Sequence, residues 1–152
     1  MRHDSRLSDV LHILLHMAEE EGPVTSEVLA NAMHTNPVVI RRTMAGLREQ
    51  GYVRSAKGHG GGWTLDCDLS QVTLLDIYIA LGRPPLLAIG SRTKAHGCLV
   101  EEAVDAALNQ ALHEAQERLL SRFGEISLSI LSADLRRRLK RRHRSKTALT
   151  VP

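Results

Sequence analysis

Apolar residues recur every three or four positions along much of this chain, which is the spacing of amphipathic helices. The first such stretch predicts a helix over residues 5–20, which ends before Gly22 and Pro23. Thr25 is a suitable N-cap for a second, shorter helix, because its hydroxyl can accept a hydrogen bond from an unpaired backbone N–H. The inward face of this second helix is expected to hold Val28, Leu29 and Ala32.

A third amphipathic stretch follows a short turn and predicts a helix over residues 37–50. Asn36 can cap this helix, and Pro37 fits its first position, where a missing N–H removes no hydrogen bond. Gly51 is expected to end the helix. Its predicted buried stripe consists of Ile40, Met44 and Leu47.

Two short strand-like runs, residues 52–55 and 63–66, flank the sequence Lys-Gly-His-Gly-Gly-Gly at residues 57–62. A glycine-rich segment between two such runs is typical of the tip of a β-hairpin. Trp63, the only tryptophan, begins the second run and is expected to pack at the base of the hairpin. Helix, turn, helix and hairpin is the order of a winged helix-turn-helix, so the pattern predicts a DNA-binding regulator.

The second half of the chain is again predicted to be helical. Thr73 is a suitable cap for a short helix over residues 74–81, and the longest periodic stretch predicts a helix over residues 99–123. Ser127 and Ser132 can start one or two further turns, after which the basic tail is expected to continue as a frayed helix. A long helix that stands off a small domain indicates a dimer contact.

The expected fold class is therefore mainly α with a small β-hairpin. The expected parts are a winged helix-turn-helix DNA-binding domain at residues 1–82, a linker loop at 83–98, a dimerisation helix region at 99–135 and a basic tail at 136–152.

Charge is distributed unevenly along the chain. The formal net charge is +3, and because residues 136–146 contribute eight positive charges and no acid, the rest of the chain carries −5. A DNA-binding face in the body must therefore use locally clustered charge, since the field of the body as a whole repels phosphate. No apolar run is long enough to span a bilayer and no signal-peptide core is present, so a cytoplasmic protein without membrane partners is expected.

Three segments together resemble one known family. They are residues 40–53, the glycine wing at residues 58–63, and residues 73–77 with the sequence Thr-Leu-Leu-Asp-Ile. This combination resembles the Rrf2 family of winged-helix transcription regulators, over about residues 5–135. The resemblance implies a homodimer, in which helix 99–123 packs against its counterpart and against the first helix of the other subunit.

The cysteines depart from the family's iron–sulfur members, which place three cysteines in the loop and at the start of the long helix. Here that region contains only Cys98, so no iron–sulfur cluster and no other cofactor is expected. Cys98 lies beside His96 at a predicted helix N-terminus, which favours thiolate chemistry. A redox switch, a metal site shared with His96 and an inert thiol all stay open, while Cys67 is expected to be structural.

The predicted DNA-contacting residues lie at the starts of the second and third helices and in the wing. They are Thr25, Asn36, Val38, Val39, Arg41, Arg42, Lys57, Gly58, His59, Gly60 and Gly61. The third helix is expected to enter the major groove, where an arginine contacts guanine, and the wing the minor groove. The alternatives are solvated arginines, helix caps and an ordinary hairpin tip.

The basic tail either binds the DNA backbone without sequence preference or keeps the protein soluble. The sequence as a whole predicts a homodimeric transcriptional regulator, most simply a repressor, that binds a double-stranded operator and responds to an unknown small-molecule or redox signal. The alternative is a winged-helix module for protein contacts or effector binding without specific DNA binding. No nucleophile, base and orienting group converge in one motif, so an enzyme is not expected.

Overall fold

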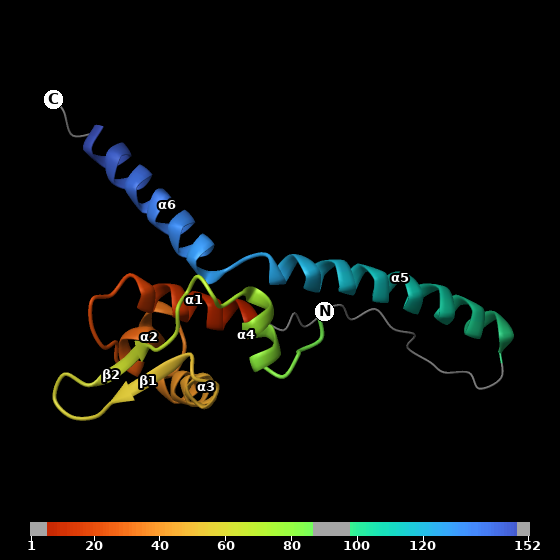
Figure 1. Cartoon of the computed structure of the whole chain (residues 1–152), viewed down its shortest axis with the longest axis horizontal. Coiled ribbons are helices and arrows are strands. Elements are labelled where there is room, and N and C mark those ends of the chain that lie inside the picture. Colours follow the sequence, from red (N-terminus) through yellow and green to blue (C-terminus); the bar gives the residue numbers. More distant parts are fainter. Residues whose placement is uncertain (1–5, 87–97, 149–152) are drawn as a thin grey trace.

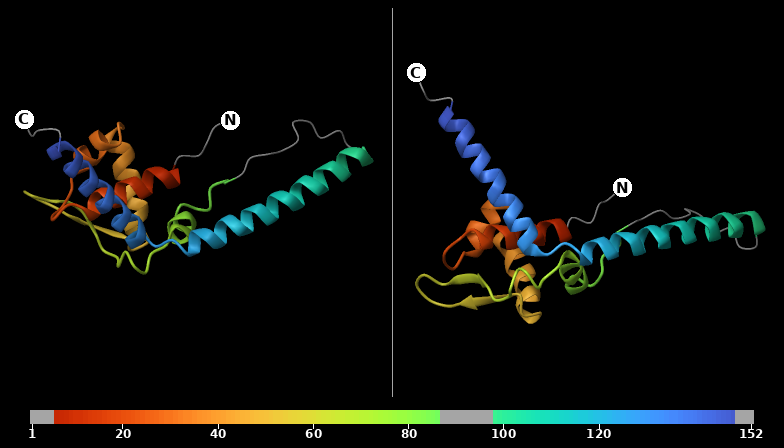
Figure 2. Two further views of the ribbon diagram at one scale, coloured as in Figure 1. Left: turned by 90° about the horizontal axis from the view of Figure 1, so that it is seen from above. Right: turned by 45° about the horizontal axis from the view of Figure 1, so that its top comes forward.

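The structure is a computed structural model that describes residues 6–86 and 98–148, with side chains as far as Arg142. The elements, in chain order, are α1 (Arg6–Ala18), α2 (Ser26–Ala32), α3 (Pro37–Glu49), β1 (Val53–Ala56), β2 (Gly62–Leu65), α4 (Leu74–Ala80), α5 (Leu99–Gly124) and α6 (Leu128–Ala148) (Figure 1). The first six elements gather into one winged domain, from which α5 and α6 project in different directions (Figure 2). The predicted fold class, mainly α with one hairpin, is confirmed.

The core of the winged domain is aliphatic and draws on every surrounding helix. Ile13 of α1, Met44 of α3, Ile77 of α4 and Leu128 of α6 are all at most 2% exposed. Burial of such side chains contributes about 1.5–3 kcal/mol each. The first turn of α6 is therefore part of the core of the winged domain, although the rest of the helix leaves that domain.

The starts of α2 and α3 form as the sequence predicts. The Thr25 hydroxyl accepts a hydrogen bond from the Val28 backbone N–H at 3.3 Å, and the Asn36 side chain accepts one from the Val38 N–H at 2.8 Å. The predicted inward position of Val28 is wrong, because this side chain is 53% exposed. A helix of seven residues buries one narrow face, and in α2 that face consists of Ser26, Leu29 and Ala30.

Helix α3 has the predicted buried stripe and the predicted end. Ile40, Met44 and Leu47 are buried at helical spacing. Gly51 follows the C-cap with φ of 79°, a left-handed conformation that glycine adopts without steric cost. The opposite side of α3 is left free for an external partner.

Strands β1 and β2 pair antiparallel, from Val53 opposite Leu65 to Ala56 opposite Gly62. Trp63 ties this hairpin to the start of α2, as expected of a residue at the base of the wing. Its backbone exchanges two hydrogen bonds with Val24, and its indole Nε1–H donates to the Ser26 hydroxyl at 3.0 Å. The wing is thus held in a fixed position beside the helix-turn-helix.

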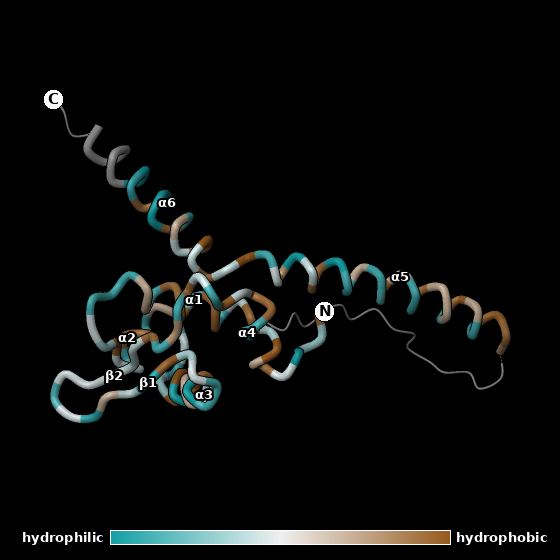
Figure 3. The backbone as a smooth tube through the Cα atoms, in the orientation of Figure 1, coloured by the Kyte–Doolittle hydropathy of each residue, from teal (hydrophilic) through white to brown (hydrophobic). Residues whose placement is uncertain are grey.

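Helix α5 touches the winged domain only near its C-terminal end. Phe123 packs edge-on against Tyr78 of α4, with ring centroids 6.3 Å apart. Its described residues, Leu99 to Gly124, include none that is buried. Figure 3 shows apolar stretches recurring along the length of this exposed helix, whereas α6 is hydrophilic beyond its first turns.

Helix α6 is longer and more regular than the sequence predicts. The expected one or two turns followed by a frayed tail are one continuous helix of 21 residues, which runs across the expected boundary at residues 135 and 136. Pairing between Thr73 and Ser127 fixes the point at which it starts. None of the helices in the described part of the chain has the length and apolar composition that crossing a membrane requires.

Candidate nucleic-acid interface

The outer face of α3 and the wing lie at the same edge of the winged domain (Figure 1). On α3, Val38 and Val39 are 56% and 52% exposed, and Arg41 and Arg42 are exposed beside them. These four side chains occupy the first half of the helix, where a recognition helix meets base edges. All of the predicted DNA-contacting residues are exposed except Gly61, which is half-buried.

Two of the predicted contact residues already hold hydrogen bonds within the chain. The side-chain oxygens of Thr25 and Asn36 accept from the backbone of their own helices. Their capping role, one of the two alternatives from the sequence, is therefore present in the structure. Contact between these residues and a phosphate stays a prediction, because a hydroxyl or amide has further hydrogen-bonding capacity.

Arg41 is held by a carboxylate that the sequence reasoning missed. Its Nη2 lies 2.6 Å from Oε1 of Glu27 on α2, and both side chains are more than half exposed. A hydrogen bond from the Glu27 backbone N–H and the nearby Arg41 guanidinium lower the pKa of the Glu27 carboxyl. The pair orients Arg41 from the side of α2 and leaves its other N–H donors for a base or phosphate.

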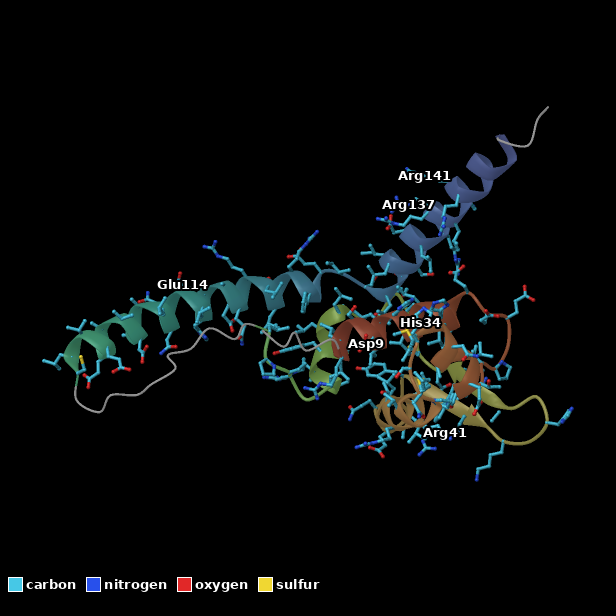
Figure 4. The ribbon with its side chains drawn as sticks, turned by 180° about the vertical axis from the view of Figure 1, so that it is seen from behind. Asp9, His34, Arg41, Glu114, Arg137 and Arg141 are labelled. Atoms are coloured by element: carbon cyan, nitrogen blue, oxygen red, sulfur yellow. The ribbon has the colours of Figure 1, made fainter. Side chains whose placement is uncertain are left out.

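Arg42 lies on a different part of the helix surface from Arg41. It lines a groove of about 670 Å³ between α1, the turn after α2, α3 and the end of α4. Asp9, His34 and Thr43 line the same groove, over a largely aliphatic floor. Figure 4 shows Asp9 and His34 on one side of the domain and Arg41 at its lower edge. The two arginines that sequence reasoning treated alike therefore have different surroundings.

The backbone conformation of the wing requires glycine at two positions. Gly60 has φ of 77°, which other residues adopt at a steric cost. A side chain at Gly62 would place Cβ 2.8 Å from the Val24 carbonyl oxygen. Lys57, Gly58 and His59 are exposed at the tip. The geometry thus explains why the tip is glycine-rich, and it also presents exposed backbone and one lysine beside α3.

The two cysteines differ in exposure and chemistry. Cys98 is the exposed N-cap residue of α5, and its side chain makes no capping hydrogen bond. Cys67 follows β2 and is half-buried, and burial together with Asp66 and Asp68 raises the pKa of its thiol. His96, the expected neighbour of Cys98, lies outside the described residues. Cys98 is therefore the more accessible thiol of the two.

Comparison with known families agrees with this geometry. A family model described as Rrf2, an iron-dependent transcriptional regulator, matches residues 3–134. The chain belongs to the Rrf2 family. Among its relatives, it is 28% identical over 125 residues to YwnA of Bacillus subtilis (strain 168), a proposed HTH-type transcriptional regulator, with 82% of this chain and 92% of YwnA covered. It is 26% identical over 133 residues to YffB of Lactococcus lactis subsp. lactis, named in the same way, with 85% of each chain covered.

Solved structures show the same fold. A proposed transcriptional regulator from Lactobacillus plantarum superposes with a TM-score of 0.71 at 26% identity, over 94% of this chain and 99% of that one. The T. potens protein IscR superposes with a TM-score of 0.67 at 17% identity, over 89% of this chain and 88% of its own. This Rrf2 protein is thus a DNA-binding transcriptional regulator. The family match ends at Asp134, so most of α6 lies beyond it.

Proposed function

We propose that this Rrf2 protein is a sequence-specific repressor that binds its operator as a homodimer in the cytoplasm and catalyses no reaction. Helix α3 lies in the major groove and the tip of the wing in the adjacent minor groove. The observation that supports this arrangement is the shared edge formed by the exposed half of α3 and the wing (Figure 1). Trp63 and its contacts with Val24 and Ser26 hold the two at a fixed separation, which a rigid duplex requires.

The homodimer follows from the unburied apolar residues of α5. Leu99, Val100, Val104 and Leu108 are 78%, 72%, 51% and 46% exposed in a single chain. Apolar side chains in a row along one helix are a surface that a second copy can cover. A two-fold symmetric dimer would present two α3 helices to two half-sites of the operator.

We also propose that this family member senses its signal without an iron–sulfur cluster. Such clusters are held by several cysteine thiolates, and this chain has two cysteines. One of them, Cys67, is half-buried with a raised pKa, which disfavours the thiolate form that a ligand needs. Among the described residues, no three His, Cys, Asp or Glu side chains are grouped as metal ligands. The described residues therefore do not fit a cluster.

Two inputs fit the structure in place of a cluster. One is reaction of the exposed Cys98 thiol at the start of α5. The other is a small molecule in the groove behind α3, because Val39, Arg42 and Thr43 line this groove and belong to the recognition helix. Either input would act by moving α3 or α5 relative to the operator.

An electrophoretic gel shift tests the proposed function. The probe is a set of duplexes tiled across the region upstream of the protein's own gene, with excess random-sequence duplex as competitor. A discrete complex that resists the competitor and is lost in an Arg41→Ala, Arg42→Ala variant is the expected result. A smear that the competitor removes equally from wild type and variant would instead indicate a protein-interaction or effector-binding module without specific DNA binding.

A further inference from the structure

The described part of α6 beyond its first two turns is strongly cationic. We call residues 136–142 the α6 arm. The arm contains six cationic side chains, Arg136, Arg137, Arg138, Lys140, Arg141 and Arg142, and no acid. Asp134, one turn earlier, binds Arg137 at 3.2 Å and Arg138 at 2.6 Å. No ion pair involves Lys140, Arg141 or Arg142 within the part of the chain that the structure describes. The arm therefore has positive charge left over for an external anion.

The base of α6 fixes the direction in which the arm points. Leu128 is fully buried in the core and Ser132 is 4% exposed. Glu19, just after α1, accepts hydrogen bonds from the Ser132 hydroxyl at 3.2 Å and from Arg136 Nε at 2.9 Å. The helix is thus held at its first two turns, and beyond Arg136 it leaves the domain.

The arm points away from the DNA-binding edge. Figure 4 places Arg137 and Arg141 toward the top of the view and Arg41 of α3 at the lower edge of the winged domain. Figure 1 and the right-hand view of Figure 2 agree, since α6 rises on the side of α1 that is opposite to α3 and the hairpin. At about 1.5 Å per residue, each further turn of α6 carries its charges farther from α3. A duplex bound by α3 and the wing is therefore out of reach of the arm.

The chemistry of the arm favours a nucleic acid over an acidic protein. Protein interfaces have an apolar core that is depleted in charged residues, whereas the arm is mostly charged and Leu139 is its one large apolar side chain that is exposed. Arginine and lysine on several sides of one helix match a polymer of regularly spaced phosphates. The arm also lies beyond residues 3–134, which match the family model.

We propose that the α6 arm binds the phosphate backbone of a second DNA duplex, so that one protein holds the operator and a distant segment together. This proposal rests on the proposed function, in which α3 and the wing occupy the operator. It takes up the first alternative from the sequence, in which the basic tail binds a DNA backbone without sequence preference, and assigns that contact to a second duplex. Contact with phosphate without base recognition means that the second duplex needs no particular sequence.

A capture assay with the full chain tests this proposal. The upstream duplex that gives the discrete complex is immobilised, the protein is bound, and retention of a fluorescent random-sequence duplex is measured against salt concentration. The test variant is Arg141→Gln, Arg142→Gln, and the matched control is Arg118→Gln, Arg122→Gln on α5, which removes the same charge. We expect the test variant alone to lose capture, with the slope of log affinity against log salt reduced by up to about 1.8. An Arg141→Lys, Arg142→Lys variant should keep capture, because the ammonium group of lysine also pairs with a phosphate.

Three results would overturn the proposal. One is equal capture by wild type and by the Arg141→Gln, Arg142→Gln variant. Another is loss of operator affinity in this variant in step with capture, which would place the arm on the operator itself. The third is that the arm binds polyglutamate and does not capture the fluorescent duplex, which would indicate an acidic protein as its partner.

A separate measurement keeps the failure of the proposed function distinguishable. The Arg41→Ala, Arg42→Ala variant disables the recognition helix but leaves the arm intact. Random-sequence duplex should still bind this variant and should be released when Arg141→Gln and Arg142→Gln are added. Release of the random-sequence duplex supports DNA binding by the arm, even if no upstream duplex gives a discrete complex. Failure to release it counts against DNA binding by the arm, even if an upstream duplex does give a discrete complex.

Discussion

The winged domain and α5 use their apolar residues in opposite ways. Met44 and Ile77, in the winged domain, are fully buried, whereas Val104 and Leu108 of α5 are about half exposed. Both regions are helical and carry aliphatic side chains at helical spacing. One chain is therefore sufficient to complete the core of the winged domain, while the apolar surface of α5 stays exposed in a single chain, which supports the proposed dimer. Folding stability and association are expected to depend on different residues.

The largest expected effect is on the stability of the winged domain. Replacing Met44 by Ala removes a fully buried side chain from the middle of the core and leaves a cavity. We expect the free energy of unfolding to fall by about 2–5 kcal/mol, as measured by urea denaturation. The same measurement on Val104→Ala, at constant protein concentration, is the control and should show a much smaller loss. Equal decreases in the free energy of unfolding for the two variants would contradict the proposed difference between the winged domain and α5.

Association should show the reverse dependence. Replacing Leu108 and Leu112 by Glu places two charges on the surface that the proposed dimer covers. Light scattering should then report a monomer with an unchanged circular dichroism spectrum. Operator affinity should fall by a factor on the order of 100 or more, because the two recognition helices no longer bind as one unit. A dimer that persists in this variant would contradict the role given to α5.

Within the winged domain, the two arginines of α3 should differ in effect. A bidentate arginine–guanine contact discriminates against other bases by about 1–3 kcal/mol. Glu27 orients Arg41, whereas Arg42 lines the groove behind the helix. We expect Arg41→Ala to lose base discrimination at one operator position and Arg42→Ala to lose less, in a binding assay over all single-base operator variants. The opposite ranking would show that Arg42 is the base-reading side chain.

A smaller effect is expected at Glu27 itself. The variant Glu27→Gln removes a negative charge from the DNA-binding edge and releases Arg41. Affinity for random-sequence duplex should rise, while discrimination between operator and random duplex should fall. Glu114→Gln, on α5, is a control that removes a carboxylate far from that edge (Figure 4). A rise in both affinity and discrimination would show that Glu27 only repels DNA.

The smallest expected effect concerns the thiols. Cys98 is exposed, whereas Cys67 is half-buried and its raised pKa keeps it protonated at neutral pH. Mass spectrometry after brief maleimide treatment should find Cys98 labelled before Cys67. If Cys98 transmits a redox signal, Cys98→Ser should bind the operator as wild type does but lose its response to peroxide. An unchanged response in Cys98→Ser would leave the groove behind α3 as the site of the signal.

Several elements were predicted correctly because their causes are local. A cap, a helix-starting proline and a terminating glycine act on their immediate neighbours, so Asn36, Pro37 and Gly51 bounded α3 correctly. The long helix was expected at 99–123 and is α5, Leu99–Gly124. Val28 was misplaced because, in a helix of seven residues, apolar spacing does not decide which face meets the core.

The candidate DNA-binding site was only partly predictable. The sequence identified exposed residues on α3 and in the wing. On α3, helical periodicity alone separated the exposed residues from the buried stripe of Ile40, Met44 and Leu47. It did not predict the contact between Glu27 and Arg41, which joins residues 14 positions apart on two helices. Such a contact depends on the angle at which α2 and α3 pack, and no local pattern specifies that angle.

The sequence by itself determined the elements as far as α5, the eight positive charges of the basic tail and the number of cysteines, since these are properties of composition and of neighbouring residues. Only the tertiary structure decided what those elements face. It directs α6 away from α3, because Leu128 is buried in the core and Glu19, just after α1, accepts hydrogen bonds from Ser132 and Arg136. It also leaves α5 uncovered, since the core of the winged domain is already filled. The direction of α6 and the exposure of α5 follow from packing between segments that are distant in the sequence, so the local sequence pattern does not predict them.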